Sequence, residues 1–216
     1  MITRKEFERQ YSADLLPSTF SNYSIGDLWD WKGFIFNRHL VANNMNIAEV
    51  CDDANLLDVL ESIPMQDASL PDVDLTDDFK SDPSLTLPSI NLSLKDVLDI
   101  TKVESFHFAA VQGKNAIGYN SRMLVALDNL RKTDFETYSK QIRGYEVVVG
   151  LFYAGSVNLT INKSVSNQAD IDAKLKSIAT GDTKLSIDTS DARTIKYVIT
   201  NSKCPFAAEF KLGREL

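Results

Sequence analysis

Polar and apolar residues alternate along much of the second half of the chain, and this period of two predicts strands. The clearest case places Val157, Leu159 and Ile161 on one side of a strand and the intervening Asn158 and Thr160 on the other. Several such segments follow one another without an intervening helix, which favours an antiparallel or mixed sheet. The predicted strands cover residues 106–112, 145–163, 184–189, 194–200 and 206–212.

Helical periodicity marks the other elements of the chain. Thr3 with Glu6, and Asn46 with Glu49, have the spacing of a capping box, in which two side chains satisfy N–H groups at the start of a helix. Besides the helix that starts at Thr3, helices are predicted at residues 46–63, 93–100, 121–143 and 169–179. We therefore expect one α+β domain over residues 1–216, with a twisted antiparallel or mixed central sheet flanked by helices.

A long mobile loop is predicted at about residues 64–92. This segment contains Pro71, Pro83 and Pro88, which interrupt regular structure, and many of the acidic residues of the chain. Loops of this length are uncommon inside a compact domain and are often functional.

Charge is distributed unevenly. The formal net charge is -7 and the pI is about 4.9, which disfavours nucleic acid as a partner. Residues 51–82 contain ten acidic residues and one base, Lys80, and so carry -9, which leaves about +2 for the remainder. Anionic lipid headgroups therefore remain candidate partners of the remainder. The candidate acidic surface for a protein partner consists of Asp72, Asp74, Asp77 and Asp78.

The stretch from residue 29 to residue 38 joins large aromatic side chains to basic ones and alternates as a strand does. Aromatic rings gather at the headgroup level of membranes, where basic side chains meet anionic lipid. The alternative is a core strand with bases at its edges. The residues proposed for membrane or partner contact are Trp29, Trp31, Lys32, Phe34 and Arg38.

Motifs for catalysis are missing. GxxxxGK[ST], GxGxxG after a strand, HExxH and CxxC do not occur. His107 lies between two phenylalanines on a predicted strand, which favours a solvent-facing or hydrogen-bonded histidine over a catalytic base. A calcium loop starting at Asp72 fails because Asp77 and Pro83 stand where glycine and glutamate are required. We therefore expect no enzyme, no catalytic residue, no metal and no cofactor.

Targeting signals are missing as well. The first residues lack the apolar segment of a secretory signal. No apolar run approaches the roughly 18 residues that cross a bilayer as a helix. A cytoplasmic location is the resulting expectation.

Three stretches resemble the pore-forming domain of the gasdermin family, particularly its short bacterial members. They are FHFAAVQG at residues 106–113, SKQIRGYEVVVGLFYAGSVNLTIN at 139–162 and CPFAAEFKLGREL at 204–216. In gasdermins a strand and a helix lead to a long strand, and a final strand with small apolar residues closes the domain. YSIGDLWDW at residues 23–31 also resembles the "vGd" segment near the family's N-terminus.

The resemblance implies a soluble, non-enzymatic protein that waits for a trigger. It would then associate with an anionic membrane, insert β-hairpins and assemble a large homo-oligomeric ring. Cell death or defence, including antiviral defence, would be the process. Because the chain ends at Leu216, with almost no tail after the last predicted strand, we expect that either a separate inhibitory protein restrains it or it does not make pores.

Two rival functions stay open. The first is a soluble acidic binding or inhibitor protein, such as an immunity protein or regulatory subunit, which docks a basic partner through residues 51–82. The second is an enzyme of unrecognised type. A deep pocket that holds paired carboxylates or His107 would favour the enzyme.

Overall fold

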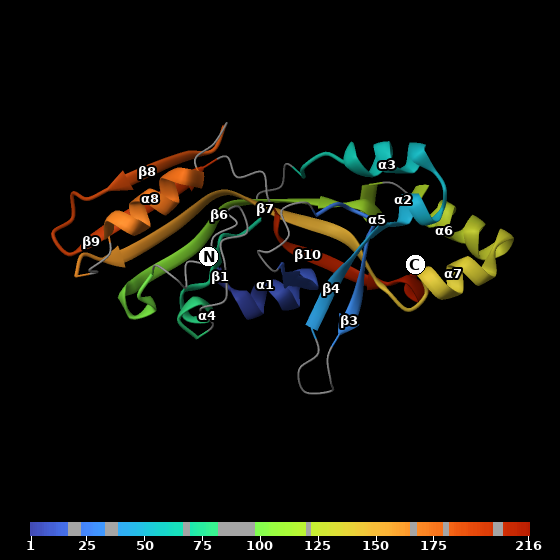
Figure 1. Cartoon of the computed structure of the whole chain (residues 1–216), viewed down its shortest axis with the longest axis horizontal. Helices are drawn as coiled ribbons and strands as arrows, with labels where there is room; N and C mark the ends of the chain where they lie inside the picture. Colours follow the sequence, from blue (N-terminus) through green and yellow to red (C-terminus); the bar gives the residue numbers. More distant parts are fainter. Residues whose placement is uncertain are drawn as a thin grey trace. The chain divides into compact units, whose positions relative to one another are not determined.

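The computed structural model describes residues 1–16, 23–32, 39–66, 70–81, 98–119, 122–164, 168–178, 182–200 and 205–216. These residues form an α+β fold in which helices accompany a mixed sheet (Figure 1). The sheet is mixed because β1 (Ile2–Thr3) and β5 (Val73–Asp74) are parallel, whereas β5 and β6 (Val103–Asn115) are antiparallel. The predicted fold class is thereby confirmed.

The chain divides into two compact units. Unit 1 consists of Met1–Asn22, Gln66–Gln112 and Phe152–Ala207, and unit 2 consists of Tyr23–Met65, Gly113–Leu151 and Ala208–Leu216. The strands β6, β7 (Glu146–Asn162) and β10 (Pro205–Leu212) contribute residues to both units. That the whole chain behaves as one domain stays a prediction.

In its described residues, unit 1 combines three α-helices with most of the predicted strands. Its helices are α1 (Arg4–Tyr11), α4 (Thr76–Ser81) and α8 (Gln168–Ile178). The second part of β7 pairs antiparallel with β9 (Thr194–Thr200), and β9 pairs antiparallel with β8 (Lys184–Asp188). The short β2 (Ala13–Leu15) also belongs to this unit.

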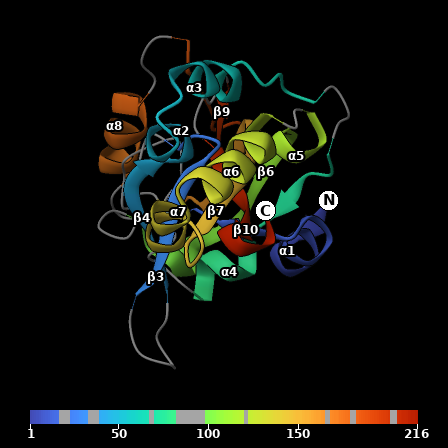
Figure 2. The same cartoon turned by 90° about the vertical axis from the view of Figure 1, so that its right-hand side faces the viewer.

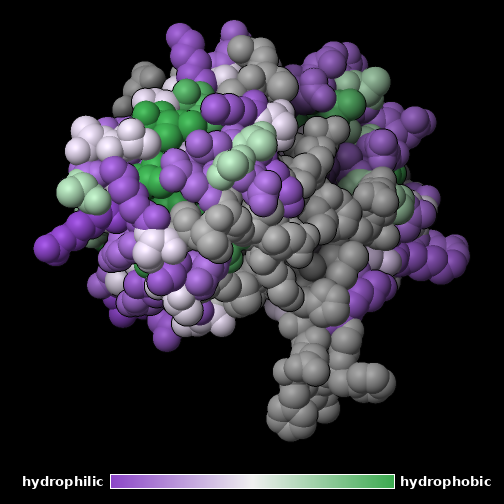
Figure 3. Space-filling view, turned by 60° about the vertical axis from the view of Figure 1, so that its left-hand side comes forward, coloured by the Kyte–Doolittle hydropathy of each residue, from purple (hydrophilic) through white to green (hydrophobic). Residues whose placement is uncertain are grey.

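Aromatic rings fill the core of unit 1. Phe7 on α1 lies edge-on to Phe152 with 5.0 Å between ring centroids, and Phe108 lies 4.3 Å from Phe206. Burying one such side chain stabilises a fold by about 1.5–3 kcal/mol. The predicted capping box of Thr3 and Glu6 at the start of α1, the helix that carries Phe7, is confirmed. In the space-filling view most of the described residues at the surface are hydrophilic, and hydrophobic residues show in several separate places among them (Figure 3).

Part of the predicted loop at residues 64–92 forms regular structure. β5 and α4 lie within it, and their Val73 and Phe79 side chains are buried in the core of unit 1. Residues 67–69 and 82–97, which include most of the predicted helix at 93–100, lie outside the described residues. The mobility of the segment stays a prediction.

Unit 2 contains a two-stranded ribbon and five helices of the described residues. β3 (Asp27–Lys32) pairs antiparallel with β4 (His39–Asn46) and with the first part of β7. The helices, seen in Figure 2, are α2 (Ile47–Val50), α3 (Ala54–Glu61), α5 (Ala116–Tyr119), α6 (Arg122–Thr133) and α7 (Phe135–Gln141).

Two long helices predicted in this unit are each divided in two, so the prediction of single helices was wrong. In the first, Asp52 takes a positive φ of 50° and the Asp53 side chain accepts a hydrogen bond from Leu56 N at 3.0 Å, which starts α3 afresh. In the second, Asp134 accepts from Thr137 N at 3.0 Å and starts α7. Aspartate competes in this way because its short side chain satisfies N–H groups at a helix start. The predicted capping box at Asn46 is confirmed.

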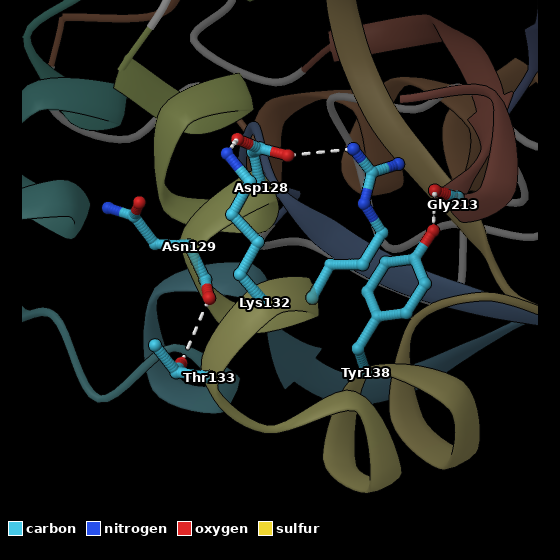
Figure 4. A network of polar contacts seen from close by, with 7 residues as sticks. Asp128, Asn129, Lys132, Thr133, Tyr138 and Gly213 are labelled. Atoms are coloured by element: carbon cyan, nitrogen blue, oxygen red, sulfur yellow. Dashed lines mark hydrogen bonds and ion pairs between the residues drawn. The ribbon is translucent and has the colours of Figure 1, made fainter.

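A polar network joins the end of α7 to the last residues of the chain (Figure 4). The Tyr138 hydroxyl donates a hydrogen bond to Gly213 O at 3.1 Å, and Gly213 N donates to Tyr145 O at 2.9 Å. On α6, Asp128 pairs with Arg131 and Lys132, whose contacts lower the pKa of Asp128. A Cβ atom on Gly213 would lie 2.2 Å from the backbone oxygen of Ile142, so only glycine fits at this position.

We expect the substitution Gly213→Ala to lower the free energy of unfolding by about 1–3 kcal/mol, because the added methyl group forces the backbone apart. Urea denaturation measures this change. The matched control is Gly144→Ala in the same unit, where a Cβ would meet no atom within 4 Å. The control should stay within about 0.5 kcal/mol of the wild type. Equal stability of the two variants would contradict the close packing at Gly213.

Candidate functional site

Three antiparallel strands of unit 1 separate polar from apolar side chains most completely. In the register, Leu159 of β7 lies opposite Tyr197 of β9, and Tyr197 lies opposite Ile187 of β8. The covered face of these strands consists of Val157, Leu159, Ile161, Leu185, Ile187, Ile195, Tyr197 and Ile199, all buried in or packed against the core. The polar face consists of Ser156, Asn158, Thr160, Asn162, Lys184, Ser186, Asp188, Thr194, Lys196 and Thr200, with Val198 among them.

Helix α8 belongs to the same core as the covered face. Its Ile171 and Leu175 side chains are 0% and 1% exposed and share a cluster with the apolar residues of β7, β8 and β9. Asp170 and Lys176 of the same helix are exposed. The helix is therefore amphipathic and keeps water from apolar side chains that a bare sheet would expose.

One hydrogen bond joins the polar part of α8 to the sheet. The hydroxyl of the buried Tyr197 donates to Asp172 Oδ1 at 2.6 Å. Burial raises the pKa of Tyr197, and the bond to the carboxylate raises it further, so the hydroxyl keeps its proton at neutral pH. Hydrogen bonds to charged groups contribute about 1.5–3 kcal/mol to stability.

The turn between β8 and β9 is held by its own side chains and by β7. Asp191 Oδ1 accepts from Arg193 N at 2.7 Å and from Thr194 N at 2.8 Å, and these bonds lower the pKa of Asp191. Lys163, at the end of β7, donates through Nζ to Thr189 O at 2.7 Å and also to Asp191 O. The tip is thus fixed to the strand beside it.

The candidate acidic surface divides into two pairs. Asp72 Oδ1 accepts from the backbone N of Ala110 at 2.9 Å, at a point where Ala110 has a positive φ of 52°. Asp74 Oδ1 accepts from Thr76 N at 2.9 Å and lies 3.2 Å from the Nδ1 atom of His107. Burial raises the pKa of Asp74, but its bonds to Thr76 and its contact with His107 outweigh burial and lower it. These two carboxylates therefore hold β5 and α4 against β6.

Asp77 and Asp78 lie in the first turn of α4, where acidic side chains favour the helix start. Asp77 is exposed and Asp78 is half-buried. These two residues are available to a partner of unit 1, and partner docking through all four aspartates stays a prediction.

The candidate aromatic contact residues lie in different surroundings. Trp29 is 0% exposed and packs between Tyr23 and Phe210 in the core of unit 2, so in this conformation its side chain does not reach the surface. Trp31 is 39% exposed, and its Nε1 atom donates to Glu146 Oε1 at 3.2 Å. Lys32 is exposed and pairs with Asp30, and this contact raises the pKa of Lys32. The remaining candidates, Phe34 and Arg38, lie outside the described residues.

Other chemistry is sparse in the described part of the chain. Its histidine, cysteine and acidic side chains form no group of three that could hold a metal ion. Burial raises the pKa of the Cys51 thiol to about 11, and Asp53 adds to this, so Cys51 is a poor nucleophile at neutral pH. None of the helices that the structure describes is both long and apolar enough to cross a membrane.

Two features of the site escaped prediction from the sequence. The first is the bond between Tyr197 and Asp172. Two sequence signals could have indicated it: Tyr197 falls on the same face of its strand as Ile195 and Ile199, and Asp172 directly follows the inward-facing Ile171. The second is a small hydrogen-bond network in unit 2, in which the buried Asn46 donates through Nδ2 to Asp27 Oδ1 and to Ile25 O, both at 3.0 Å. Burial raises the pKa of Asp27 there.

Comparison with known proteins gives a structural similarity but no match in sequence. No protein-family model matches the chain, and no curated protein matches it in sequence. Among solved structures, it is similar to a bacterial gasdermin from Bradyrhizobium tropiciagri, with 13% sequence identity and a TM-score of 0.48. The similarity covers 94% of this chain and 82% of that chain.

We expect Tyr197→Phe to loosen α8, because Asp172 loses its buried hydrogen-bond donor. Amide hydrogen exchange within α8 should accelerate by about tenfold, which corresponds to about 1.4 kcal/mol. The matched control, Asp170→Asn, changes an exposed carboxylate on the same helix and should exchange as the wild type does. Unchanged exchange in Tyr197→Phe would show that the hydroxyl does not hold α8.

Proposed function

We propose that this protein is a non-enzymatic effector that acts through contact with a membrane or a protein, and that pore formation of the gasdermin kind is its specific activity. The observation that carries the proposal is the separation of a covered apolar face from a polar face on β7, β8 and β9. A sheet of this kind can offer one face to lipid and the other to water, provided that its edges are closed by assembly.

Strand length supports the same proposal. A strand needs about 9–11 residues to cross a bilayer. β7 is a continuous strand of 17 residues, and its second part alternates between the two faces. β9 and β8 have 7 and 5 residues, so they must lengthen. Because α8 lies between β7 and β8 in the sequence, its release supplies residues for longer strands.

The proposed cycle starts in the cytoplasm, where α8 shields the covered face and a separate inhibitory protein restrains the chain. After a trigger, the protein meets an anionic membrane and assembles as a homo-oligomer. Trp31 and Lys32 are the exposed candidates for first contact with headgroups. Defence by cell death, antiviral defence included, is the process that such a pore serves.

Dye release from liposomes tests pore formation. We expect release from anionic vesicles, with or without limited proteolysis, and much less from zwitterionic vesicles, because basic side chains meet anionic headgroups. Tyr197→Phe should raise the rate about tenfold if release of α8 is the slow step, and Asp170→Asn should not. If no dye is released from anionic vesicles under any of these conditions, the proposal of pore formation is contradicted.

A soluble acidic binding or inhibitor protein remains the alternative, and the exposed start of α4 favours it. In that case Asp77→Lys combined with Asp78→Lys should abolish capture of the basic partner in a pull-down. Asp72 and Asp74 are unsuitable for this test because they hold β5 and α4 against β6. Reversal of the exposed Asp170 on α8 serves as the control, and binding that survives the double reversal at α4 would count against this function.

A further inference from the structure

The outer edge of β8 offers backbone groups for another strand. β8 pairs with β9 along one edge, and none of the described strands pairs with its other edge. Lys184, Ser186 and Asp188 are exposed, while Leu185 and Ile187 are half-buried against the core. An edge of this kind, without proline or bulge, is a template for pairing with a second chain.

The sequence of this edge complements itself when it is read in the opposite direction. Residues 183–189 read Thr-Lys-Leu-Ser-Ile-Asp-Thr. In an antiparallel pair centred on Ser186, Lys184 of one copy meets Asp188 of the other, and Leu185 meets Ile187. Apolar pairs and opposite charges of this kind each stabilise antiparallel strands.

We propose that β8 pairs antiparallel with β8 of a second copy of this chain, with the two-fold axis at Ser186. Side chains alternate between faces, so a pairing that keeps the apolar faces together must be centred on a residue. Centring on Lys184 sets two lysines opposite each other, and centring on Leu185 or Ile187 leaves both charges without an opposite charge. Ser186 is the centre that matches charge with charge and apolar with apolar residue.

The surrounding charges support this register. In β9, Lys196 lies opposite Asp188, so the dimer places Asp188 between Lys196 of its own copy and Lys184 of the partner copy. Charges of opposite sign therefore alternate across the joined strands on the polar face. On the other face, the Leu185 and Ile187 pairs continue the covered face from one copy into the next.

The two-fold contact is closed, because each copy uses the same edge and none is left for a third. A five-residue strand makes a small interface, so we expect a dissociation constant in the micromolar range. The pairing goes beyond the proposed function, and it is measured in solution without lipid. Its failure and the failure of pore formation are therefore distinguishable.

Sedimentation equilibrium of the full chain, at about 10–200 µM, measures the pairing. The wild type should dimerise, and Lys184→Glu and Asp188→Lys should each raise the dissociation constant about tenfold or more, because like charges then meet twice. An equimolar mixture of the two variants should recover the dimer, since each variant supplies the charge that the other lacks. Recovery requires opposed charges across the interface, which a merely damaged fold cannot provide.

Two controls complete the experiment. Lys176→Glu makes the same charge change on the exposed side of α8 and should leave the dimer intact. Ser186→Cys should form an intermolecular disulfide on mild oxidation, because residues at the two-fold axis lie within the reach of a disulfide. The wild type, with its own Cys51 and Cys204, should not cross-link under the same conditions. A monomeric wild type at the highest concentration, or an unaltered dimer in Lys184→Glu, would overturn the proposal.

Discussion

The covered face of β7, β8 and β9 has to be kept from water, and this requirement organises unit 1. Eight apolar side chains project from one side of three strands, and Ile171 and Leu175 of α8 complete their burial. Hydrophobic contact alone is non-directional and would allow the helix to slide. The bond from Tyr197 to Asp172 adds direction, because a buried hydroxyl must find its acceptor in one place.

The fold could be predicted from the sequence wherever the order of polar and apolar residues, or the spacing of two capping residues, defined an element locally. Alternation located β7, β8 and β9, and the paired spacing of Thr3 with Glu6 located the start of α1. Helix breaks escaped because Asp53 and Asp134 act locally, through single side-chain bonds that leave the apolar period intact. The short β1 and β5 escaped because two residues carry no period, and their pairing depends on partners distant in the sequence.

The candidate site was anticipated as a pattern and not as a set of contacts. The division into a polar and an apolar face could be inferred from the alternating residues of β7 and β9 alone. The helix that covers the apolar face, and the carboxylate that receives the Tyr197 hydroxyl, depend on tertiary packing that periodicity does not describe. Trp29 shows the opposite case, since an aromatic residue suited to a membrane interface is buried between Tyr23 and Phe210.

Under the proposed pore-forming function, the apolar residues under α8 would be subject to two selective demands of unequal strictness. A folded interior requires matching shapes, since a change of one methylene is felt at crystal-like packing density. Lipid tails are fluid, so contact with them requires only that a side chain be hydrophobic. An exchange such as Ile161→Val would change the hydrophobicity that a bilayer meets very little, yet it leaves a gap of one methylene group in the packed resting fold. Volume, more than polarity, is therefore the property through which inherited variation would adjust how readily the protein leaves its resting state.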